Sequence, residues 1–225
     1  MTGNGKPNPL MAHHLVRAMV QDGGVVTLTQ LKRRGLSRGA AGLPARLLDE
    51  GTDRSRHLVP VLYFASDLKT IKQPQWVLRH LALFFEAGRL LGIDRGDWQV
   101  VKPGSDAQTA DGVWARGPVG AGLDYSAEID TGYPWDKVLS KIKTAGPPGF
   151  HISLTEPEAT RLGYLGLIWS TDSRVRADRL RRKLMAWLDF EQLQPSTSQR
   201  AAGVKVYQWT GKGRTFTVWT LIAKL

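Results

Sequence analysis

The order of apolar and polar residues predicts three helical segments in the first fifty residues. Apolar positions recur every three or four residues in 10–20 and again in 28–34, which is the spacing of one helix face. Glycines follow both segments closely, which favours helix ends there. A third helix is expected within 37–50, where leucines have helical spacing and a proline suits the first turn: Leu43, Pro44, Leu47 and Leu48.

A basic turn at 54–57 and an apolar, strand-like run at 58–65 follow these segments. Three helices before a turn and a strand are the order of a winged helix-turn-helix, in which the third helix enters the major groove and the turn is the wing. We therefore expect a DNA-binding domain over 10–72, behind a disordered tail at 1–9. A plain three-helix packing unit with solvated arginines is the alternative. The candidate DNA-binding side chains are Arg33, Arg34, Arg38, Arg46, Arg54 and Arg56.

The remainder of the chain mixes helices with short strands, and 75–91 is its clearest helix. An α/β domain is expected over 73–193 and a C-terminal extension, a β-hairpin, over 194–225. The fold class is therefore α+β or α/β. The expected strands lie at 98–102, 111–116, 123–129 and 150–154, the further helices at 135–144, 156–165 and 173–190, and the hairpin strands at 204–209 and 215–222.

The composition adds a strong positive charge to this picture. The 225 residues hold 31 Lys and Arg against 20 Asp and Glu, a formal net charge of +11. This charge is +6 in residues 1–75, −1 in 76–150 and +6 in 151–225. Nucleic acid, most of all double-stranded DNA, is the expected partner of so basic a chain. Four further candidate phosphate-binding side chains lie in the basic helix at 173–190: Arg174, Arg176, Arg179 and Arg182.

Several classes of protein are excluded by what the sequence lacks. The absence of cysteine excludes a disulfide scaffold, a cysteine-based zinc finger, an iron–sulfur site and a thiol nucleophile. No apolar run reaches the roughly 18 residues of a membrane span, and residues 1–9 contain no apolar signal core. We expect a cytoplasmic protein with no membrane partner. A homodimer and a larger nucleoprotein complex are both compatible with the sequence.

Three carboxylates at the ends of predicted strands are the candidate metal-binding and catalytic groups. Glu128 and Asp130 are two apart on one strand and so share a face, and Asp111 opens the neighbouring strand. Together they would suit Mg²⁺ or Mn²⁺ and phosphodiester chemistry. Lys137 and Lys141, one turn apart on the next helix, are candidates to stabilise negative charge. Solvent-facing or turn roles for the three acids are the alternative.

The order of these features resembles the replication-relaxation family of plasmids and mobile elements. The resemblance rests on the segments Arg79-His80-Leu81-Ala82, Ala110-Asp111-Gly112-Val113 and Ala127-Glu128-Ile129-Asp130-Thr131-Gly132, followed by a helix with lysines and by Phe150-His151-Ile152-Ser153-Leu154. It implies a winged helix joined to a domain similar to the restriction-endonuclease-like, PD-(D/E)xK fold. It also implies that Asp111 and Glu128 are the two motif acids and that His80 is a helix histidine before that core.

The sequence departs from the nuclease motif at two positions. The motif's lysine position is occupied by Asp130, and the proline expected before the first acid is replaced by Ala110. We therefore expect a DNA-binding protein of a plasmid or mobile element, acting in replication, mobilisation or regulation, whose nuclease-like domain is a degenerate platform. An active endonuclease dependent on Mg²⁺ or Mn²⁺ is the alternative, with Asp111, Glu128, Asp130, Lys137, Lys141 and His80 as its candidate catalytic residues.

Two other classes of function stay open from the sequence. One is a protein–protein adaptor in a transfer or replication complex. The other is an RNA- or single-strand-binding component, because the C-terminal hairpin carries aromatic residues between basic ones. The same alternation is equally typical of aromatic core packing. The residues concerned are Lys205, Tyr207, Trp209, Lys212, Arg214, Phe216 and Trp219.

Overall fold

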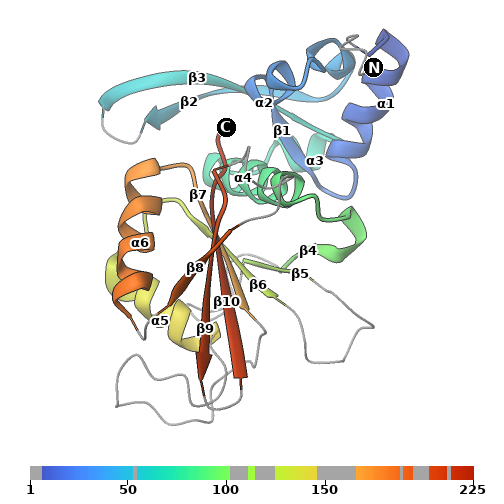
Figure 1. Ribbon diagram of the computed structural model, residues 1–225. Helices are drawn as coiled ribbons and strands as arrows, with labels where there is room; N and C mark the ends of the chain where they lie inside the picture. Colours follow the sequence, from blue (N-terminus) through green and yellow to red (C-terminus); the bar gives the residue numbers. More distant parts are fainter. Residues whose placement is uncertain are drawn as a thin grey trace. The chain divides into compact units, whose positions relative to one another are not determined.

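A computed structural model gives the fold of the chain (Figure 1). It describes residues 7–52, 55–101, 111–114, 125–145, 166–187, 190–194, 203–211 and 214–225. The fold is a mixed α+β one, as the sequence predicts. The chain divides into two units: Met1–Glu86 with Lys224–Leu225, and Ala87–Ala223. The expected boundaries at 72/73 and 193/194 thus differ from this division.

The first unit is built around a three-stranded antiparallel sheet with the strand order β1-β3-β2. Helix α4 starts in this unit and continues past its boundary at Glu86. The elements in chain order are α1 Pro9–Val20, β1 Val25–Thr27, α2 Leu28–Arg33, the 3-10 helix η1 Ser37–Ala40, β2 Ala45–Thr52, β3 Ser55–Ala65, α3 Leu68–Ile71 and α4 Gln75–Leu91.

Side-chain caps fix the starts of the first two helices, both of which the sequence predicts. The Asn8 side chain accepts a hydrogen bond from the Met11 N–H at 2.8 Å, and Pro9 occupies the first turn. The Thr27 hydroxyl accepts from the Gln30 N–H, while the Gln30 side chain accepts from the Thr27 N–H, which makes a capping box. The expected tail at 1–9 therefore ends before Asn8, and its residues 1–6 lie outside the described residues.

The third helix predicted within 37–50 is wrong beyond its first turn. Only Ser37–Ala40 are helical, and Ala45–Thr52 form strand β2, which pairs with β3. Burial alternates along β2 with a period of two: Leu48 is partly buried, whereas Leu47 is 63% exposed. The adjacent leucines fit both periods in the sequence, and cross-strand pairing decides between them. Among the described residues, the element that follows η1 is therefore strand β2 and not the predicted helix.

Gly39 allows η1 to touch the backbone of α1. A Cβ at position 39 would lie 2.2 Å from the Ala12 carbonyl oxygen, which cannot move without disturbing α1. We expect Gly39→Ala to lower the free energy of unfolding by about 1–3 kcal/mol, the usual cost of overpacking. Gly51→Ala is the matched control, because a Cβ there meets no atom within 4 Å. Equal midpoints of urea unfolding for the two variants would contradict this close packing.

The second unit is built around a seven-stranded mixed sheet with the order β4-β5-β6-β7-β10-β9-β8. The pairs β6–β7 and β7–β10 are parallel and the others antiparallel. Its elements are the 3-10 helix η2 Arg95–Asp97, β4 Trp98–Val100, β5 Gly112–Trp114, β6 Tyr125–Asp130, α5 Trp135–Ala145, β7 Gly166–Thr171, α6 Arg174–Ala186, β8 Glu191–Leu193, β9 Lys205–Gly211 and β10 Arg214–Ile222.

The C-terminal hairpin is confirmed, and it belongs to this sheet rather than to a separate extension. Strands β9 and β10 pair with each other, and β10 also pairs with β7 near the middle of the sheet. The strand expected at 150–154 and the helix at 156–165 lie outside the described residues. No helix in the described part of the chain combines the length and apolar composition needed to cross a membrane.

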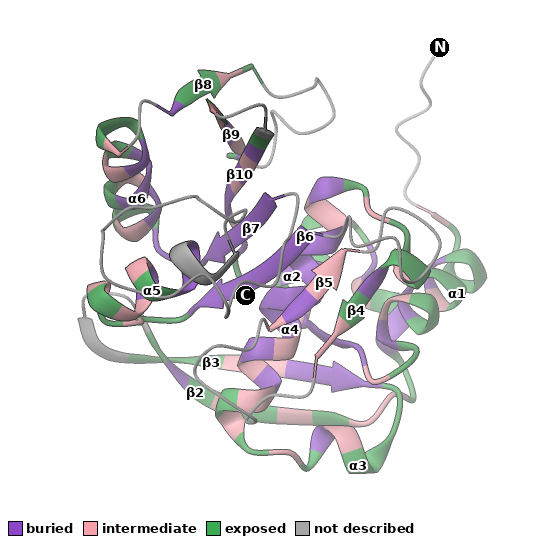
Figure 2. Cartoon of the chain, turned by 90° about the horizontal axis from the view of Figure 1, so that it is seen from below, coloured by how far each residue is buried: buried purple, intermediate pink, exposed green. Residues whose placement is uncertain are grey.

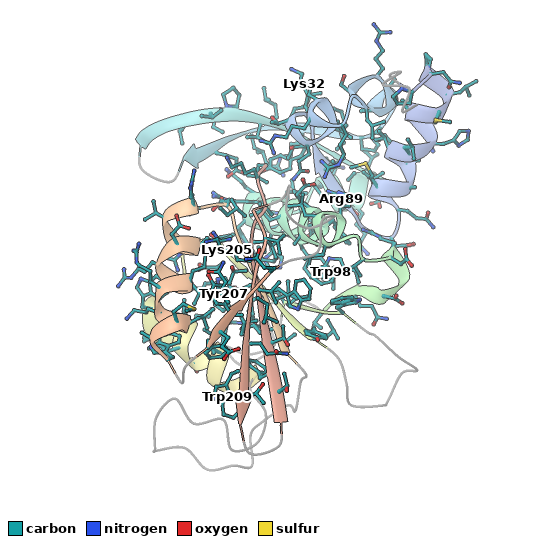
Figure 3. The ribbon with its side chains drawn as sticks, in the orientation of Figure 1. Lys32, Arg89, Trp98, Lys205, Tyr207 and Trp209 are labelled. Atoms are coloured by element: carbon teal, nitrogen blue, oxygen red, sulfur yellow. The ribbon has the colours of Figure 1, made fainter. Side chains whose placement is uncertain are left out.

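Helices α5 and α6 cover one face of the seven-stranded sheet (Figures 1 and 2). Every residue of strands β6 and β7 is buried. The core on this face includes Trp169 of β7, Val138 of α5 and Leu180 of α6. Tyr207 and Phe216 of the hairpin are buried in the same core, at 1% and 0% exposure. Figure 3 labels Tyr207 and its neighbour Trp209 on β9, and Trp209 is only partly buried. Core packing therefore accounts for Tyr207 and Phe216, which offer no surface for stacking bases.

Candidate functional site

The candidate site lies in the second unit, where the end of β6 meets α5 and α6. Glu128 and Asp130 alternate with Ala127 and Ile129 along β6, so their side chains lie on one face, as the sequence predicts. Both carboxylates are almost fully buried, at 3% and 1% exposure. Buried carboxylates are costly unless they are paired, and each has a cationic partner from a different helix. These partners define the chemistry of the site.

Lys141 of α5 is the partner of Glu128. Its ammonium nitrogen lies 2.5 Å from Glu128 Oε2, and both side chains are 4% exposed. The pKa of Glu128 is raised to about 8, first by burial and then by the nearby Asp111 carboxylate, while Lys141 opposes the rise. Glu128 thus keeps its proton up to about pH 8 in the folded chain, whereas it would release that proton near pH 4.5 in an unfolded chain.

Asp111 immediately precedes β5, and its side chain is hydrogen-bonded to the end of β6. Its Oδ2 accepts the Ile129 N–H at 2.7 Å and the Tyr133 hydroxyl at 3.3 Å. Burial, followed by the charges of Asp111 and Glu128, raises the pKa of the Tyr133 phenol. Tyr133 is therefore a hydrogen-bond donor held neutral beside the two acids. The Lys137 ammonium lies 4.1 Å from the centre of its ring, a cation–π contact.

Asp130 is bonded on both carboxylate oxygens. Its Oδ1 accepts the N–H groups of Gly132 and Tyr133, each at 2.9 Å. Its Oδ2 accepts from Arg176 Nη2 at 2.8 Å and Nε at 3.0 Å, and from Trp169 Nε1 at 3.3 Å. These bonds tie β6, β7 and α6 together. The arrangement is typical of a structural anchor.

The structure brings Asp111 and Glu128 together but turns Asp130 to a separate set of partners. No group of three His, Asp or Glu side chains in the described residues is arranged to hold a metal ion. The Lys141 ammonium contacts Glu128 and Arg176 contacts Asp130, so Asp130 does not share a set of ligands with Asp111 and Glu128. Two internal cations therefore supply the positive charge that a metal would supply.

His80 belongs to a different part of the chain from these acids. It lies on α4 before Glu86, hence in the first unit, and is 8% exposed. Glu50 and Arg79 form an ion pair at 3.2 Å in the same unit. His80 is thus assigned to the first unit, whereas Asp111, Glu128 and Asp130 belong to the second.

Three of the predicted DNA-binding arginines in the first unit are used for internal contacts. Arg34 pairs with the buried Glu86 at 2.9 Å, and Arg46 donates to the Gln73 carbonyl at 2.9 Å. Arg33 donates to the Leu225 carbonyl at 3.2 Å, which anchors the last residues of the chain. Arg38 on η1 is exposed. Arg54 and the side chain of Arg56 lie outside the described part of the chain.

The basic helix α6 divides its arginines in the same way. Arg176 forms an ion pair with Asp130, whereas Arg174, Arg179 and Arg182 are exposed. Arg181, which was not among the predicted phosphate-binding residues, is 7% exposed and donates to Thr220 Oγ1 at 2.9 Å. Counting charges along the sequence cannot distinguish the internally bonded arginines from the exposed ones.

Comparison with known proteins finds no matching family model, no similar curated protein and no similar solved structure. The site is thus assigned from its own geometry. Sequence reasoning missed Tyr133 and Trp169 as parts of it. Tyr133 follows the strand-ending Thr-Gly turn, where an Asp such as Asp130 commonly accepts backbone N–H groups. That turn chemistry was a usable local signal, whereas the Trp169 contact is non-local.

Proposed function

We propose that the chain is a double-stranded DNA-binding protein of a plasmid or mobile element, related to the replication-relaxation family. The main support for this proposal is that the elements follow the chain order α1-β1-α2-η1-β2-β3 and that the strands have the sheet order β1-β3-β2. This arrangement supports a winged helix with β2 and β3 as the wing, in which η1 replaces the recognition helix. The family resemblance of the sequence supports the plasmid or mobile-element setting.

The charge of the first unit supports the same proposal. Its residues include 13 Lys and Arg against 6 Asp and Glu, a net charge of +7. Lys32 on α2 (Figure 3) and Arg38 on η1 are both exposed near the place where a reading helix would lie. Exposed cations of this kind contact phosphates and give affinity that depends on salt.

The second unit supports a nuclease-like platform. After the last residues of α4 its strands and helices run β4-β5-β6-α5-β7, with antiparallel pairing up to β6 and parallel pairing of β6 with β7. This is the order expected for the restriction-endonuclease-like fold that the sequence resembles. The Lys141 and Arg176 contacts on its acids favour a domain that holds DNA without cutting it.

The proposal predicts salt-dependent binding that uses the exposed cations of the first unit. We expect the chain to bind a short random-sequence duplex, measured by fluorescence anisotropy, with log affinity falling linearly against log salt. Lys32→Gln with Arg38→Gln should lower the slope by about 0.9 for each phosphate contact removed. Lys69→Gln with Lys72→Gln on α3 is the control of equal charge, and its slope should stay near that of the unmodified chain.

Three outcomes would contradict the proposal. Failure to bind any duplex at low salt would favour the adaptor function instead. Preferential binding of RNA or of single-stranded DNA in a competition experiment would favour the single-strand-binding function. Equal losses in both double variants would show that only total charge matters, and that α2 and η1 form no binding surface.

An active metal-dependent endonuclease is the second candidate function. The observation that favours it is the grouping of Asp111, Glu128 and Lys141, two acids and a lysine, at the end of β6. Cleavage of supercoiled plasmid with Mg²⁺ or Mn²⁺, abolished by both Asp111→Ala and Glu128→Ala, would establish it and would exclude the platform-only proposal.

A further inference from the structure

Helix α6 carries far more positive charge than its internal contacts use. Its 13 residues include six Lys and Arg but one acid, Asp178. Arg176 and Arg181 point inward, to Asp130 and to Thr220. The remaining four cations form what we call the α6 basic face: Arg174, Arg179, Arg182 and Lys183.

The geometry of the helix presents this face to solvent. Ala177, Leu180 and Leu184 are buried against the sheet, and the opposite side of α6 is exposed (Figure 2). The Arg174 side chain is 84% exposed. Asp178 lies 3.1 Å from the inward-pointing Arg181 and 3.8 Å from Arg174, so within this face it offsets part of the charge of Arg174.

Two indole rings hold cations of this face in place. The Arg179 guanidinium lies 4.3 Å from the centre of the Trp135 ring, and the Lys183 ammonium lies 5.8 Å from the centre of the Trp187 ring. A cation resting on a ring keeps its charge while losing part of its side-chain freedom before any ligand binds. Cations that are ordered in this way suit phosphate oxygens.

We propose that the α6 basic face is a second nucleic-acid contact, which binds the phosphate backbone of duplex DNA without reading its sequence. The proposal rests on the proposed function, and it gives the second unit a binding surface apart from its buried acids. Charge complementarity identifies the occupant, since four cations on one face match a polyanion. The indole rings are covered by Arg179 and Lys183, so the face offers cations rather than open stacking platforms, which disfavours a preference for single strands.

The test removes three charges from the face and measures duplex binding against salt. Arg174→Gln, Arg179→Gln and Arg182→Gln together should lower the slope of log affinity against log salt by about 3, roughly 0.9 for each contact. The loss should be equal for duplexes of different sequence. Lys69→Gln, Lys72→Gln and Lys224→Gln, three exposed lysines of the first unit, are the matched control and should leave the slope nearly unchanged.

The outcomes separate this inference from the proposed function. Absence of duplex binding by the unmodified chain overturns the proposed function and the inference together. Binding by the unmodified chain with the same slope in the α6 triple variant overturns only the inference. A triple variant that loses binding to phosphatidylserine-rich vesicles but keeps its duplex affinity assigns the face to membranes and also overturns it. The single variant Arg182→Glu, with unchanged circular dichroism, should weaken duplex binding and covers the case of a misfolded triple variant.

Discussion

Lys141→Met will destabilise the second unit by about 3–5 kcal/mol above pH 8, and by much less near pH 5. The variant leaves the buried Glu128 carboxylate beside Asp111 without its cation. Because Lys141 opposes the rise in the pKa of Glu128, its removal raises that pKa further above about 8. A protonated Glu128 needs no cation, so the loss diminishes as the pH falls.

The sign of this effect follows from linkage. A carboxyl whose pKa is raised by folding binds more protons in the folded than in the unfolded state, so its contribution to stability falls as the pH rises from about 4.5 to about 8. Lys141 limits that fall in the unmodified chain. The measurement is urea unfolding at pH 5, 7 and 9. Lys137→Met, one turn earlier on α5, should lose only the ~0.5–1 kcal/mol of a cation–π contact.

Two results would contradict this account of the Glu128–Lys141 pair. A loss in Lys141→Met that is the same at pH 5 and pH 9 would mean that Glu128 stays ionised throughout. A loss no larger than that of Lys137→Met would mean that the pair is not buried in solution. The double variant Glu128→Gln with Lys141→Met should recover most of the lost stability, because it removes both buried charges together.

Arg176→Met will cost a similar amount, about 3–5 kcal/mol, by leaving the Asp130 carboxylate buried without a cation. Asp130 keeps its backbone donors and Trp169, but the two charge-assisted bonds from Arg176 are lost. The control is Arg174→Met on the same helix, whose 84% exposed side chain should change stability by less than about 0.5 kcal/mol. Equal unfolding midpoints for the two variants would refute the role of Arg176 as an anchor.

The sequence predicted helix α4 and strands β4, β5 and β6 close to their observed positions, but it did not predict strand β2. The bounds of α4 match the predicted 75–91, because apolar residues recur with the helical period of 3.6 over all 17 residues. The strand β2 was mistaken for a helix, because Leu47 and Leu48 fit either period and only pairing with β3 distinguishes them. Intrinsic preference over so short a segment is readily overridden by tertiary contacts.

Only the part of the candidate site that follows from strand geometry was predictable from the sequence. The alternation along β6 placed Glu128 and Asp130 on one face, and Asp111 meets Glu128 there. The partners of the acids were not predictable, because Arg176 lies 46 residues after Asp130 and reaches it from α6. The sequence therefore suggested a shared metal where the structure shows two separate ion pairs. Charge counting likewise treated Arg176 and Arg182 as equivalent, although one is internal and the other exposed.

One gel tests the central claim, that the chain holds DNA through exposed cations while its own lysine and arginine neutralise the buried acids. The unmodified chain is incubated with supercoiled plasmid at low salt in the presence of Mn²⁺. Half of each sample is run on a native gel, and half is run after digestion with protease. The account predicts a retarded plasmid on the native gel and a fully supercoiled plasmid after digestion. An unretarded plasmid, or a plasmid that is nicked after digestion, would contradict it.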